Sequence, residues 1–290
     1  MSADRANLAL LAAAAVGIQV GAATVASRFA IAETTPAALA LMRYIVGFAC
    51  LAPIALTAAR VRFARRDVLP IALLGIIQFG VLIALLNYGL QTIPAGRAAL
   101  ILATFPLLTM IFGALLGRET LTAAKTLGVL ATIAGVGIAL AEKLGGGQAT
   151  WHGELAVLGA AASGAICSVL YRPYLQRYPA LTVSAAAMLA SVAALAPPAY
   201  LEGLFAGPPQ FSALAWAAIA FIGVSSGIGY FLWLWALSNA TPTRVTIFMS
   251  LSPLTAGLLG AMLLGEPLTW PFLAGSAAVV VGLWLGTRSG

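Results

Sequence analysis

Residues 90–122 read LQTIPAGRAALILATFPLLTMIFGALLGRETLT, and residues 237–269 read LSNATPTRVTIFMSLSPLTAGLLGAMLLGEPLT; the two stretches align without a gap at an offset of 147 residues. Paired charged residues, prolines and glycines recur at this offset: Arg97 and Arg244, Pro106 and Pro253, Glu119 and Glu266, Gly17 and Gly164, Gly80 and Gly227, Gly128 and Gly275, Gly135 and Gly282. Matched Arg, Pro and Glu in otherwise apolar sequence are not explained by composition. The chain therefore contains an internal repeat.

The composition around the repeat is that of a membrane protein. Of the 290 residues, 62% are hydrophobic and 8% are charged, whereas soluble domains carry about 25% charged residues. The mean hydropathy is +1.02. Windows of about 19 residues give ten apolar segments: 8–30, 36–58, 68–90, 95–116, 121–141, 152–172, 180–201, 212–236, 243–264 and 269–287. The sequence predicts an all-α integral membrane protein with ten transmembrane helices and no soluble domain.

Each repeat holds five of these segments, residues 1–145 in the first and residues 146–290 in the second. An odd number of spans makes the second copy enter the membrane from the opposite side, so the repeats are inverted. Inverted repeats are typical of secondary transporters, whose two halves alternate between openings around a site near the bilayer midplane. The organisation predicts a carrier with a small-molecule substrate.

The net charge of +7 is explained by membrane topology better than by nucleic acid, because the basic residues are scattered among apolar stretches. Ten spans place both termini on one side, and that side carries eleven basic residues: Arg5, Arg60, Arg62, Arg65, Arg66, Arg118, Lys125, Arg172, Arg177, Arg244 and Arg288. The other side has only Arg28, Arg97 and Lys143. The positive-inside rule predicts cytoplasmic termini, in a bacterial inner membrane. The basic loop 60–67 is expected to lie near anionic lipid head groups.

Several function classes lack their characteristic residues. Cys50 and Cys167 lie inside apolar runs, which argues against a disulfide framework and a metal site. No GxxxxGK[ST] motif is present, so the chain is not expected to hydrolyse ATP. A polytopic membrane enzyme would need deep His, Cys or carboxylate groups, and a channel a ring of charge or a filter segment. We expect no cofactor, no metal and no enzymatic activity.

All eight acidic residues fall at or near the ends of the predicted spans: Asp4, Glu33, Asp67, Glu119, Glu142, Glu154, Glu202 and Glu266. Coupling to protons or sodium commonly uses an acidic or histidine side chain inside the membrane. The sequence therefore predicts transport without obligatory coupling through a titrating side chain.

These motifs resemble the drug/metabolite transporter superfamily, in its EamA-type branch of ten helices and two repeats. The pattern LMRYIVGFA, residues 41–49, is similar to the second-helix motif of that branch. SLSPLTAGLLGAMLLGEPLT, residues 250–269, followed by Gly275 and Gly282, is similar to its closing motif. The chain departs from the family at Arg118, which separates Gly117 from Glu119, and at Val16, where relatives commonly have Trp. The resemblance implies export, and is greatest to bacterial exporters of aromatic amino acids.

Two prolines are candidates for the walls of a central cavity. Pro106 and Pro253 lie near the middle of predicted spans, and each leaves the carbonyl four residues earlier without its helical partner. Freed carbonyls inside a membrane are tolerated where protein or a watered cavity satisfies them. Either proline alone could simply shape packing, but their pairing favours the cavity. Gly80 and Gly227 are small residues that permit close packing or a moving gate.

Uncharged polar and aromatic side chains are the candidate substrate contacts, because hydroxyls, amides and helix dipoles can hold a zwitterion. On an uninterrupted helix Gln78 and Asn87 point to opposite sides, and Gln78 is deeper, so we favour Gln78 for the cavity. Tyr230 and Trp233 lie deeper than aromatic residues of an interfacial belt. The complete set of candidates is Gln78, Tyr230, Trp233, Ser225, Gln19, Ser163, Tyr171, Tyr88 and Asn87.

Three arginines could contact a substrate carboxylate. Arg43 lies about two helical turns into the second span, and Arg97 and Arg244 lie in the first turns of pseudo-equivalent spans. For each of them, snorkelling of the side chain to the head groups is the simpler interpretation.

The sequence as a whole predicts a carrier that exports aromatic and other neutral amino acids, or similar small metabolites. A broad drug or metabolite exporter is the alternative, because aromatic side chains also accept lipophilic cations. A polytopic membrane enzyme is the alternative from another class. The expected partners are the substrate and membrane lipids, with no nucleic acid and no protein partner, since one chain holds a complete pathway as a monomer.

Overall fold

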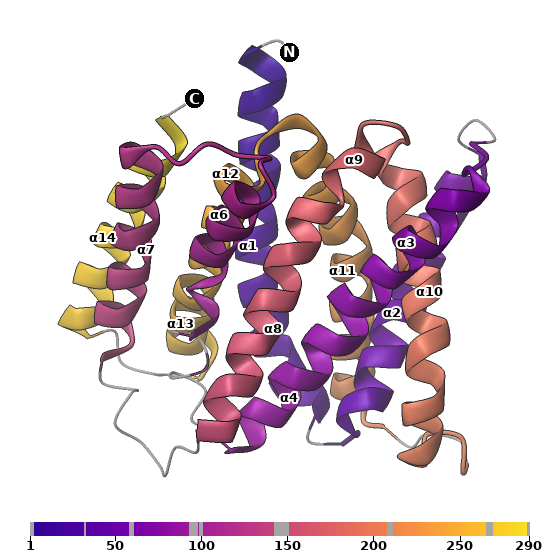
Figure 1. Cartoon of the computed structure of the whole chain (residues 1–290). Helices are drawn as coiled ribbons and strands as arrows, with labels where there is room; N and C mark the ends of the chain where they lie inside the picture. The colour runs from indigo at the N-terminus through magenta and orange to yellow at the C-terminus, as the bar shows by residue number, and fades with distance from the viewer. Residues whose placement is uncertain are drawn as a thin grey trace.

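The chain forms a bundle of helices that run between two faces of the molecule (Figure 1). The computed structural model describes residues 3–31, 33–57, 61–92, 98, 101–141, 151–207, 211–264 and 269–288. Every regular element within these ranges is a helix. Eight helices are long and apolar enough to cross a membrane, and Phe105–Leu115 and Ala123–Ala139 are shorter apolar helices. The all-α fold with ten transmembrane helices is therefore confirmed.

The first half contains α1 (Ala3–Ile31), α2 (Pro36–Thr57), α3 (Arg65–Ile76), η1 (Ile77–Val81), α4 (Leu82–Thr92), α6 (Phe105–Leu115) and α7 (Ala123–Ala139). The second half contains α8 (Trp151–Leu170), α9 (Arg172–Leu175), α10 (Ala180–Leu201), α11 (Ala213–Asn239), α12 (Pro242–Thr246), η3 (Ile247–Ser250), α13 (Leu251–Leu264) and α14 (Trp270–Arg288). The start of α1 and the end of α14 lie at the same face of the bundle, here called the termini face (Figure 1).

Large apolar side chains cover the outside of the bundle. Leu201, Trp270 and Leu115 are 84%, 83% and 77% exposed, on helices whose other positions are also mostly apolar. A soluble protein would bury such side chains, whereas a bilayer solvates them as well as a protein core does. The exposed surface therefore agrees with a protein surrounded by lipid.

The repeat-paired glycines Gly128, Gly135, Gly275 and Gly282 form one helix crossing, between α7 and α14. A side chain at Gly275 would overlap the backbone of Gly135 and Ala139, and one at Gly282 would overlap the backbone of Gly128. Glycines at a membrane helix interface let two backbones approach this closely. The same positions of the two repeats thus meet each other across the boundary between the halves.

Gly17 and Gly164 also have equivalent places in the two halves. A side chain at Gly17, on α1, would overlap the carbonyl of Phe248 in the second half. A side chain at Gly164, on α8, would overlap the ring of Phe105 in the first half. The first helix of each half therefore packs closely against the proline-containing span of the other half. These equivalent contacts agree with the repeat that the sequence predicts.

Both proline-containing spans are interrupted in the turn that precedes the proline. In the first half, residues 103–104 form a turn, and Pro106 lies in the first turn of α6. In the second half, the 3₁₀ segment η3 separates α12 from α13, and Pro253 is the third residue of α13. Proline is well tolerated in the first turn of a helix, where its missing N–H has no intrahelical acceptor. Each break thus lies at or next to residues 102 and 249, whose carbonyls the sequence predicts to lose their helical partners.

The third predicted span, 68–90, is not a uniform α-helix. Residues Ile77–Val81 form the π-helical segment η1 between α3 and α4. A π-helical turn has i→i+5 hydrogen bonds and is often found at functional sites. Gln78 and Asn87 are expected on opposite sides only of an uninterrupted helix, and this π-helical segment interrupts it. The Asn87 side chain lies outside the described part of the structure.

Candidate functional site

A cluster of buried aromatic side chains joins the two halves inside the bundle. The ring of Phe79, on η1, lies 4.6 Å from the ring of Tyr44 on α2 and 4.4 Å from that of Tyr230 on α11. Tyr230 in turn lies 6.3 Å from Tyr171, between α8 and α9. All four side chains are buried, and edge-to-face contacts at these separations are favourable. This aromatic cluster, Tyr44, Phe79, Tyr171 and Tyr230, takes two residues from each half.

Trp233 extends this environment toward the break in the first half. It lies three residues after Tyr230 on α11, so the two side chains share a face of that helix. Its ring is 6.2 Å from that of Phe105, the first residue of α6. Both Trp233 and Phe105 are buried. The aromatic surface therefore reaches the point at which the proline-containing span is interrupted.

Buried polar atoms without hydrogen-bond partners accompany the aromatic cluster. Among the described residues, Gln78 Oε1 and the hydroxyls of Tyr171, Tyr230 and Ser250 have no partner. Buried polar groups in native proteins are nearly always hydrogen-bonded, and an unsatisfied one costs about 1–3 kcal/mol. Gln78 lies on η1 beside Phe79, and Ser250 ends η3. Two of these four groups thus lie at helical irregularities and two in the aromatic cluster, while the other buried side-chain atoms without a hydrogen-bond partner in the described part of the chain belong to Thr35, Glu119, Thr241, Thr243 and Arg244.

Two further sequence candidates contact each other directly. Gln19 Nε2, on α1, donates a hydrogen bond to Ser225 Oγ, on α11, at 3.1 Å. A side chain at Gly229 would overlap the Gln19 amide, so this glycine makes room for Gln19 against α11. The contact satisfies both polar groups and ties α1 of the first half to α11 of the second.

Arg43 turns toward the interior of the bundle. Its Nε donates to Ser226 Oγ at 2.5 Å, and Ser226 is buried at the middle of the 27-residue helix α11. The guanidinium carbon lies 5.6 Å from the ring of Tyr44. The expectation that Arg43 snorkels to the head groups is therefore wrong, because its side chain has a hydrogen-bond partner near mid-membrane. A permanent positive charge lies beside the aromatic cluster.

The remaining candidates are Tyr88, Ser163, Arg244 and Arg97. Tyr88 is 50% exposed, and Ser163 Oγ donates within its own helix to the Gly159 carbonyl at 2.8 Å. Arg244 donates to the Thr287 carbonyl, which ties α12 to α14. The side chain of Arg97 lies outside the described residues. Ser163 thus has a hydrogen-bond partner within its own helix, and half of Tyr88 is exposed at the surface.

The two candidate glycines differ in their surroundings. A side chain at Gly227 would meet the backbone of Gly47, so α2 and α11 cross closely there. A Cβ at Gly80 would have only Ile76 nearby, at 3.7 Å. Gly227 thus serves helix packing, whereas Gly80 lies in the π-helical segment with space around it.

Sequence reasoning missed Tyr44, Phe79 and Phe105 as parts of this environment. Tyr44 follows Arg43 in the LMRYIVGFA stretch, and Phe79 lies between the candidates Gln78 and Gly80. Both aromatic residues therefore adjoin residues that the sequence had already marked as candidates, and this adjacency could have identified them. Phe105 precedes Pro106 directly, so its place at the break follows from the proline.

At the termini face, Asp67 connects the two halves. Its carboxylate, in the first turn of α3, accepts hydrogen bonds from Arg177 Nη1 at 2.8 Å and from the Tyr178 hydroxyl at 2.7 Å. The Tyr178 hydroxyl also accepts from the Ala64 N–H at 3.1 Å. Asp67 and Ala64 belong to the first half, and Arg177 and Tyr178 follow α9 in the second.

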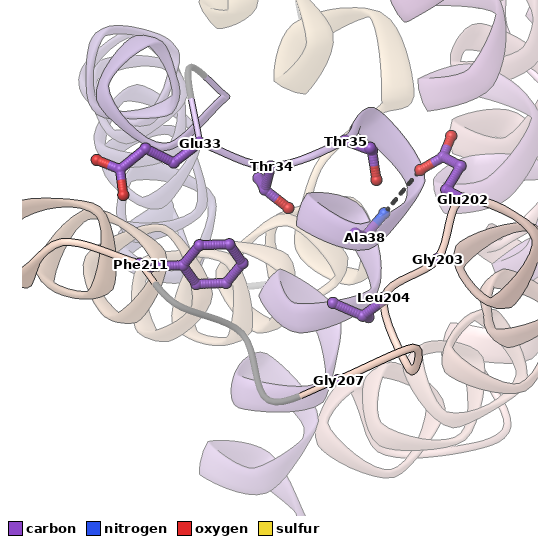
Figure 2. A pocket seen from close by; sticks show the side chains of 9 residues that line it. All are labelled: Glu33, Thr34, Thr35, Ala38, Glu202, Gly203, Leu204, Gly207 and Phe211. Carbon is purple, nitrogen blue, oxygen red and sulfur yellow. Dashed lines mark hydrogen bonds between the residues drawn. The ribbon is translucent and has the colours of Figure 1, made fainter.

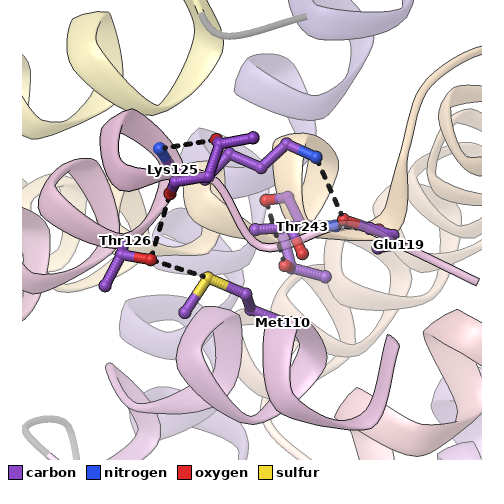
Figure 3. Close-up of polar contacts among 7 residues, drawn as sticks. Met110, Glu119, Lys125, Thr126 and Thr243 are labelled. Carbon is purple, nitrogen blue, oxygen red and sulfur yellow. Dashed lines mark hydrogen bonds and ion pairs between the residues drawn. The ribbon is translucent and has the colours of Figure 1, made fainter. Parts of the chain in front are cut away.

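Glu119, one of the repeat-paired residues, makes a second connection at the termini face (Figure 3). Its Oε1 accepts from the Thr243 N–H at 2.9 Å, and its Oε2 lies 3.6 Å from Lys125 Nζ. The side chains of Glu119 and Lys125 are 1% and 7% exposed. The hydrogen bond to Thr243 therefore joins the α6–α7 connection to the start of α12, whereas the buried ion pair lies within the first half.

At the opposite face, two carboxylates connect the halves in a reciprocal way. Glu33, after α1, accepts from the backbone N–H and the hydroxyl of Ser212, both at 2.6 Å. Glu202, after α10, accepts from the N–H groups of Ala37 and Ala38 at 2.8 and 3.2 Å. Each carboxylate thus lies at the N-terminus of a helix from the other half, where the helix dipole favours negative charge.

A cavity of about 290 Å³ lies between these two connections. Figure 2 shows the Glu202 carboxylate turned to Ala38 at the start of α2, with Leu204 on the same loop as Glu202 and Phe211 across the view from them. Its walls come from the α1–α2 and α10–α11 connections, so it belongs to the face opposite the termini. The central aromatic cluster contributes none of its lining residues.

Comparison with known proteins identifies the family. Residues 7–141 and 151–288 each match the EamA-like transporter family. A "Probable terminal-alkyne amino-acid exporter" of Streptantibioticus cattleyicolor is 31% identical over 257 residues, which cover 87% of this chain and 84% of that protein. A "Probable amino-acid metabolite efflux pump" of Salmonella typhimurium is 27% identical over 218 residues, 72% of this chain and 71% of that protein.

A solved crystal structure superposes with a TM-score of 0.81, covering 99% of this chain and 98% of that chain at 22% sequence identity. That likeness supports the fold. The matches to both halves, the interrupted pair of spans and the inverted five-helix repeats agree with one another, and the chain is a multi-pass membrane protein that belongs to the EamA-like transporter family of the drug/metabolite transporter superfamily.

Proposed function

We propose that this chain exports aromatic and other neutral amino acids, or similar small metabolites, across the bacterial inner membrane by alternating access. The observation that carries the proposal is the aromatic cluster with buried, unpartnered acceptors at Gln78, Tyr171 and Tyr230. Two relatives are named as an amino-acid exporter and an amino-acid metabolite efflux pump. Such names support transport of small molecules in preference to an enzymatic reaction.

The two ends of a zwitterionic amino acid have different partners in this proposal. The Gln78 carbonyl oxygen and the tyrosine hydroxyls accept hydrogen bonds from an ammonium group. Arg43 uses Nε for Ser226, and a guanidinium has further N–H donors that can bind a carboxylate. In this proposal the rings of the cluster, which contact one another here, separate and pack against the aromatic side chain of the substrate through stacked and edge contacts.

The halves 1–145 and 146–290 are the units that move in this proposal. Opening at the termini face requires the Asp67 and Glu119 connections to break. Opening at the other face requires the Glu33 and Glu202 connections to break. Because both sets join one half to the other, breaking them alternately would expose the aromatic cluster to one side at a time.

Counterflow of labelled tryptophan in liposomes that contain the purified protein tests the proposal. We expect uptake to be inhibited by unlabelled aromatic amino acids and more weakly by other neutral amino acids. A Gln78→Leu variant removes an unpartnered acceptor and is expected to weaken uptake, while Gln176→Leu, at an exposed position outside the spans, is the matched control. Inhibition chiefly by a lipophilic cation would instead establish the broad drug or metabolite exporter.

We further propose that a monomer carries the complete pathway and that both termini are cytoplasmic. Eleven basic residues on the side of the termini support this orientation. A fluorescent protein fused after Gly290 should fold and fluoresce in cells, whereas alkaline phosphatase at the same place should be inactive. The reverse pattern would overturn the orientation.

A further inference from the structure

An apolar groove opens on the outside of the bundle between α3 and α10. It encloses about 270 Å³ and is lined by Phe63, Val68, Ile71, Ala72, Ala186, Leu189, Ala190 and Ala193. A hydrogen bond joins the two helices: Ser191 Oγ, on α10, donates to the Gly75 carbonyl, on α3, at 2.8 Å. Figure 1 shows α3 and α10 beside each other at one edge of the bundle. The groove therefore faces the surrounding membrane and not the aromatic cluster.

The shape of the groove follows from the residues that line it. Ala186, Ala190 and Ala193 share one face of α10, at spacings of four and three residues, and their small side chains leave a hollow about 10 Å long at 1.5 Å per residue. Phe63 closes the end at the termini face, while Val68 and Leu189 are exposed rims. A narrow apolar hollow inside a bilayer fits an acyl chain.

Two arginines lie next to groove-lining residues in the sequence. Arg65 begins α3 and shares a face with Val68 and Ala72, which are three and seven residues further along. Arg62 directly precedes Phe63, the residue that closes the groove. Both arginines are exposed. Along this face of α3, the arginine thus comes first at the membrane surface, and the apolar lining residues come after it toward the membrane interior.

The positive charge of these arginines is not neutralised by the protein. Asp67, the acidic residue next to them in the sequence, is occupied by Arg177 and Tyr178. Within the described ranges, neither Arg62 nor Arg65 has an acidic side chain at ion-pair distance. A phosphate head group at the membrane surface would supply that partner, and Arg binds phosphate through paired N–H groups.

We propose that this groove is a binding site for an anionic phospholipid, with the phosphate on Arg62 and Arg65 and one acyl chain between α3 and α10. A bound lipid contacts one helix from each half, beside the Asp67–Arg177 connection. It therefore stabilises the α3–α10 contact. The site is independent of the substrate assignment, because none of its residues belongs to the aromatic cluster.

Native mass spectrometry and thermal unfolding of the purified protein in detergent test the site, with phosphatidylglycerol and phosphatidylcholine of identical acyl chains as probes. Each basic residue near an anionic surface contributes about 1 kcal/mol, so the R62Q/R65Q double variant should bind phosphatidylglycerol about 30-fold more weakly. Binding of phosphatidylcholine should change little. Added salt should weaken phosphatidylglycerol binding to the unmodified protein and not to the double variant.

Two further variants separate the site from general effects of charge. Ala190→Phe fills the hollow and should weaken binding of both lipids, while Arg5→Gln, on the termini-face end of α1, removes a charge away from the groove and should change neither. Equal binding of the two lipids by the unmodified protein, or undiminished phosphatidylglycerol binding by R62Q/R65Q, would overturn the proposal. A dimer that Ala190→Phe dissociates would assign the groove to a second copy of the chain.

Discussion

Phe79, on the π-helical segment of the first half, packs edge-on against Tyr230 of the second half, with ring centroids 4.4 Å apart and planes at 73°. The hydroxyl of Tyr230 is buried beyond this contact and has no hydrogen-bond partner among the described residues. The Tyr230 ring thus makes an apolar contact between the halves, while its hydroxyl stays without a well-formed hydrogen bond. This combination is what a site for a polar aromatic molecule requires.

Removing the unpartnered hydroxyls should affect substrate more than stability. Tyr230→Phe deletes a buried hydroxyl whose polar neighbour is the Tyr171 hydroxyl, so the free energy of unfolding should change little, because no well-formed hydrogen bond is lost. If the hydroxyl binds substrate, the KM for tryptophan counterflow should rise about fivefold to tenfold, equivalent to about 1–1.5 kcal/mol. Tyr200→Phe, an exposed tyrosine, is the control. An unchanged KM together with lower stability would contradict this role.

The glycine crossing of α7 and α14 should be intolerant of side chains. Gly275→Ala places a methyl group against the backbone of Gly135 and Ala139, and overpacking of this kind typically costs about 1–3 kcal/mol. The melting temperature of the purified variant should fall. Gly80→Ala, another helical glycine but with its nearest neighbour at 3.7 Å, should leave it unchanged or higher. Equal effects of both substitutions would refute the close crossing.

The Glu33 connection predicts a pH dependence at the face opposite the termini. The Ser212 hydroxyl and N–H donate to Glu33 and hold the pKa of its carboxyl below the ordinary value. Because the folded pKa is lowered, the stabilisation is fully present above the unfolded pKa of about 4.3 and is lost as the pH falls through the folded pKa. Melting temperatures measured from pH 7 to pH 3 should therefore fall less steeply for Glu33→Gln than for the unmodified protein.

Ser212→Ala removes one of the two donors to Glu33 and should flatten the same profile in part. The backbone N–H of residue 212 remains available, so the effect should be smaller than that of Glu33→Gln. Parallel melting profiles for all three proteins would show that Glu33 does not contribute to the acid dependence of stability.

Asp67→Asn should weaken the connection at the termini face. The substitution removes the charge that accepts from Arg177 and Tyr178. Hydrogen bonds to a charged group are stronger than those between neutral groups, but the Arg177 side chain is 44% exposed and its charge is screened by solvent, so the melting temperature should fall only modestly. Arg172→Gln removes a nearby charge as control. A cysteine introduced at the termini face should react faster with a thiol reagent in the Asp67→Asn background than in the unmodified protein, and Arg172→Gln should not change that rate.

Transport should not require a proton or sodium gradient. Gln78 and the tyrosine hydroxyls are neutral, and the buried carboxylate of Glu119 is paired with Lys125 at the termini face, away from the aromatic cluster. Titrating side chains inside the membrane are the usual route of coupling. Net flux driven by substrate alone should therefore proceed at the same rate with and without either gradient. An absolute requirement for one of them would refute uncoupled transport.

The sequence by itself determined the all-α membrane fold, its ten helices and its repeated halves. A bilayer requires every spanning backbone to satisfy its own hydrogen bonds, so long apolar stretches can only be helices. Paired positions such as Gly128 and Gly275 marked the repeat, and the structure confirms that they lie at one crossing. The sequence also marked Pro106 and Pro253, and each of these spans is interrupted in the turn before its proline.

Only the tertiary structure decided which side chains face one another inside the bundle. In soluble helices an apolar stripe marks the buried face, but here lipid and protein interior are equally apolar, so the pattern of residues carries little information about direction. For this reason the sequence offers the exposed Tyr88 and the buried Tyr171 alike as candidates, and it does not mark Phe79. The inward turn of Arg43 depends on a serine 183 residues away in the chain. Such a partner is known only once the helices are packed.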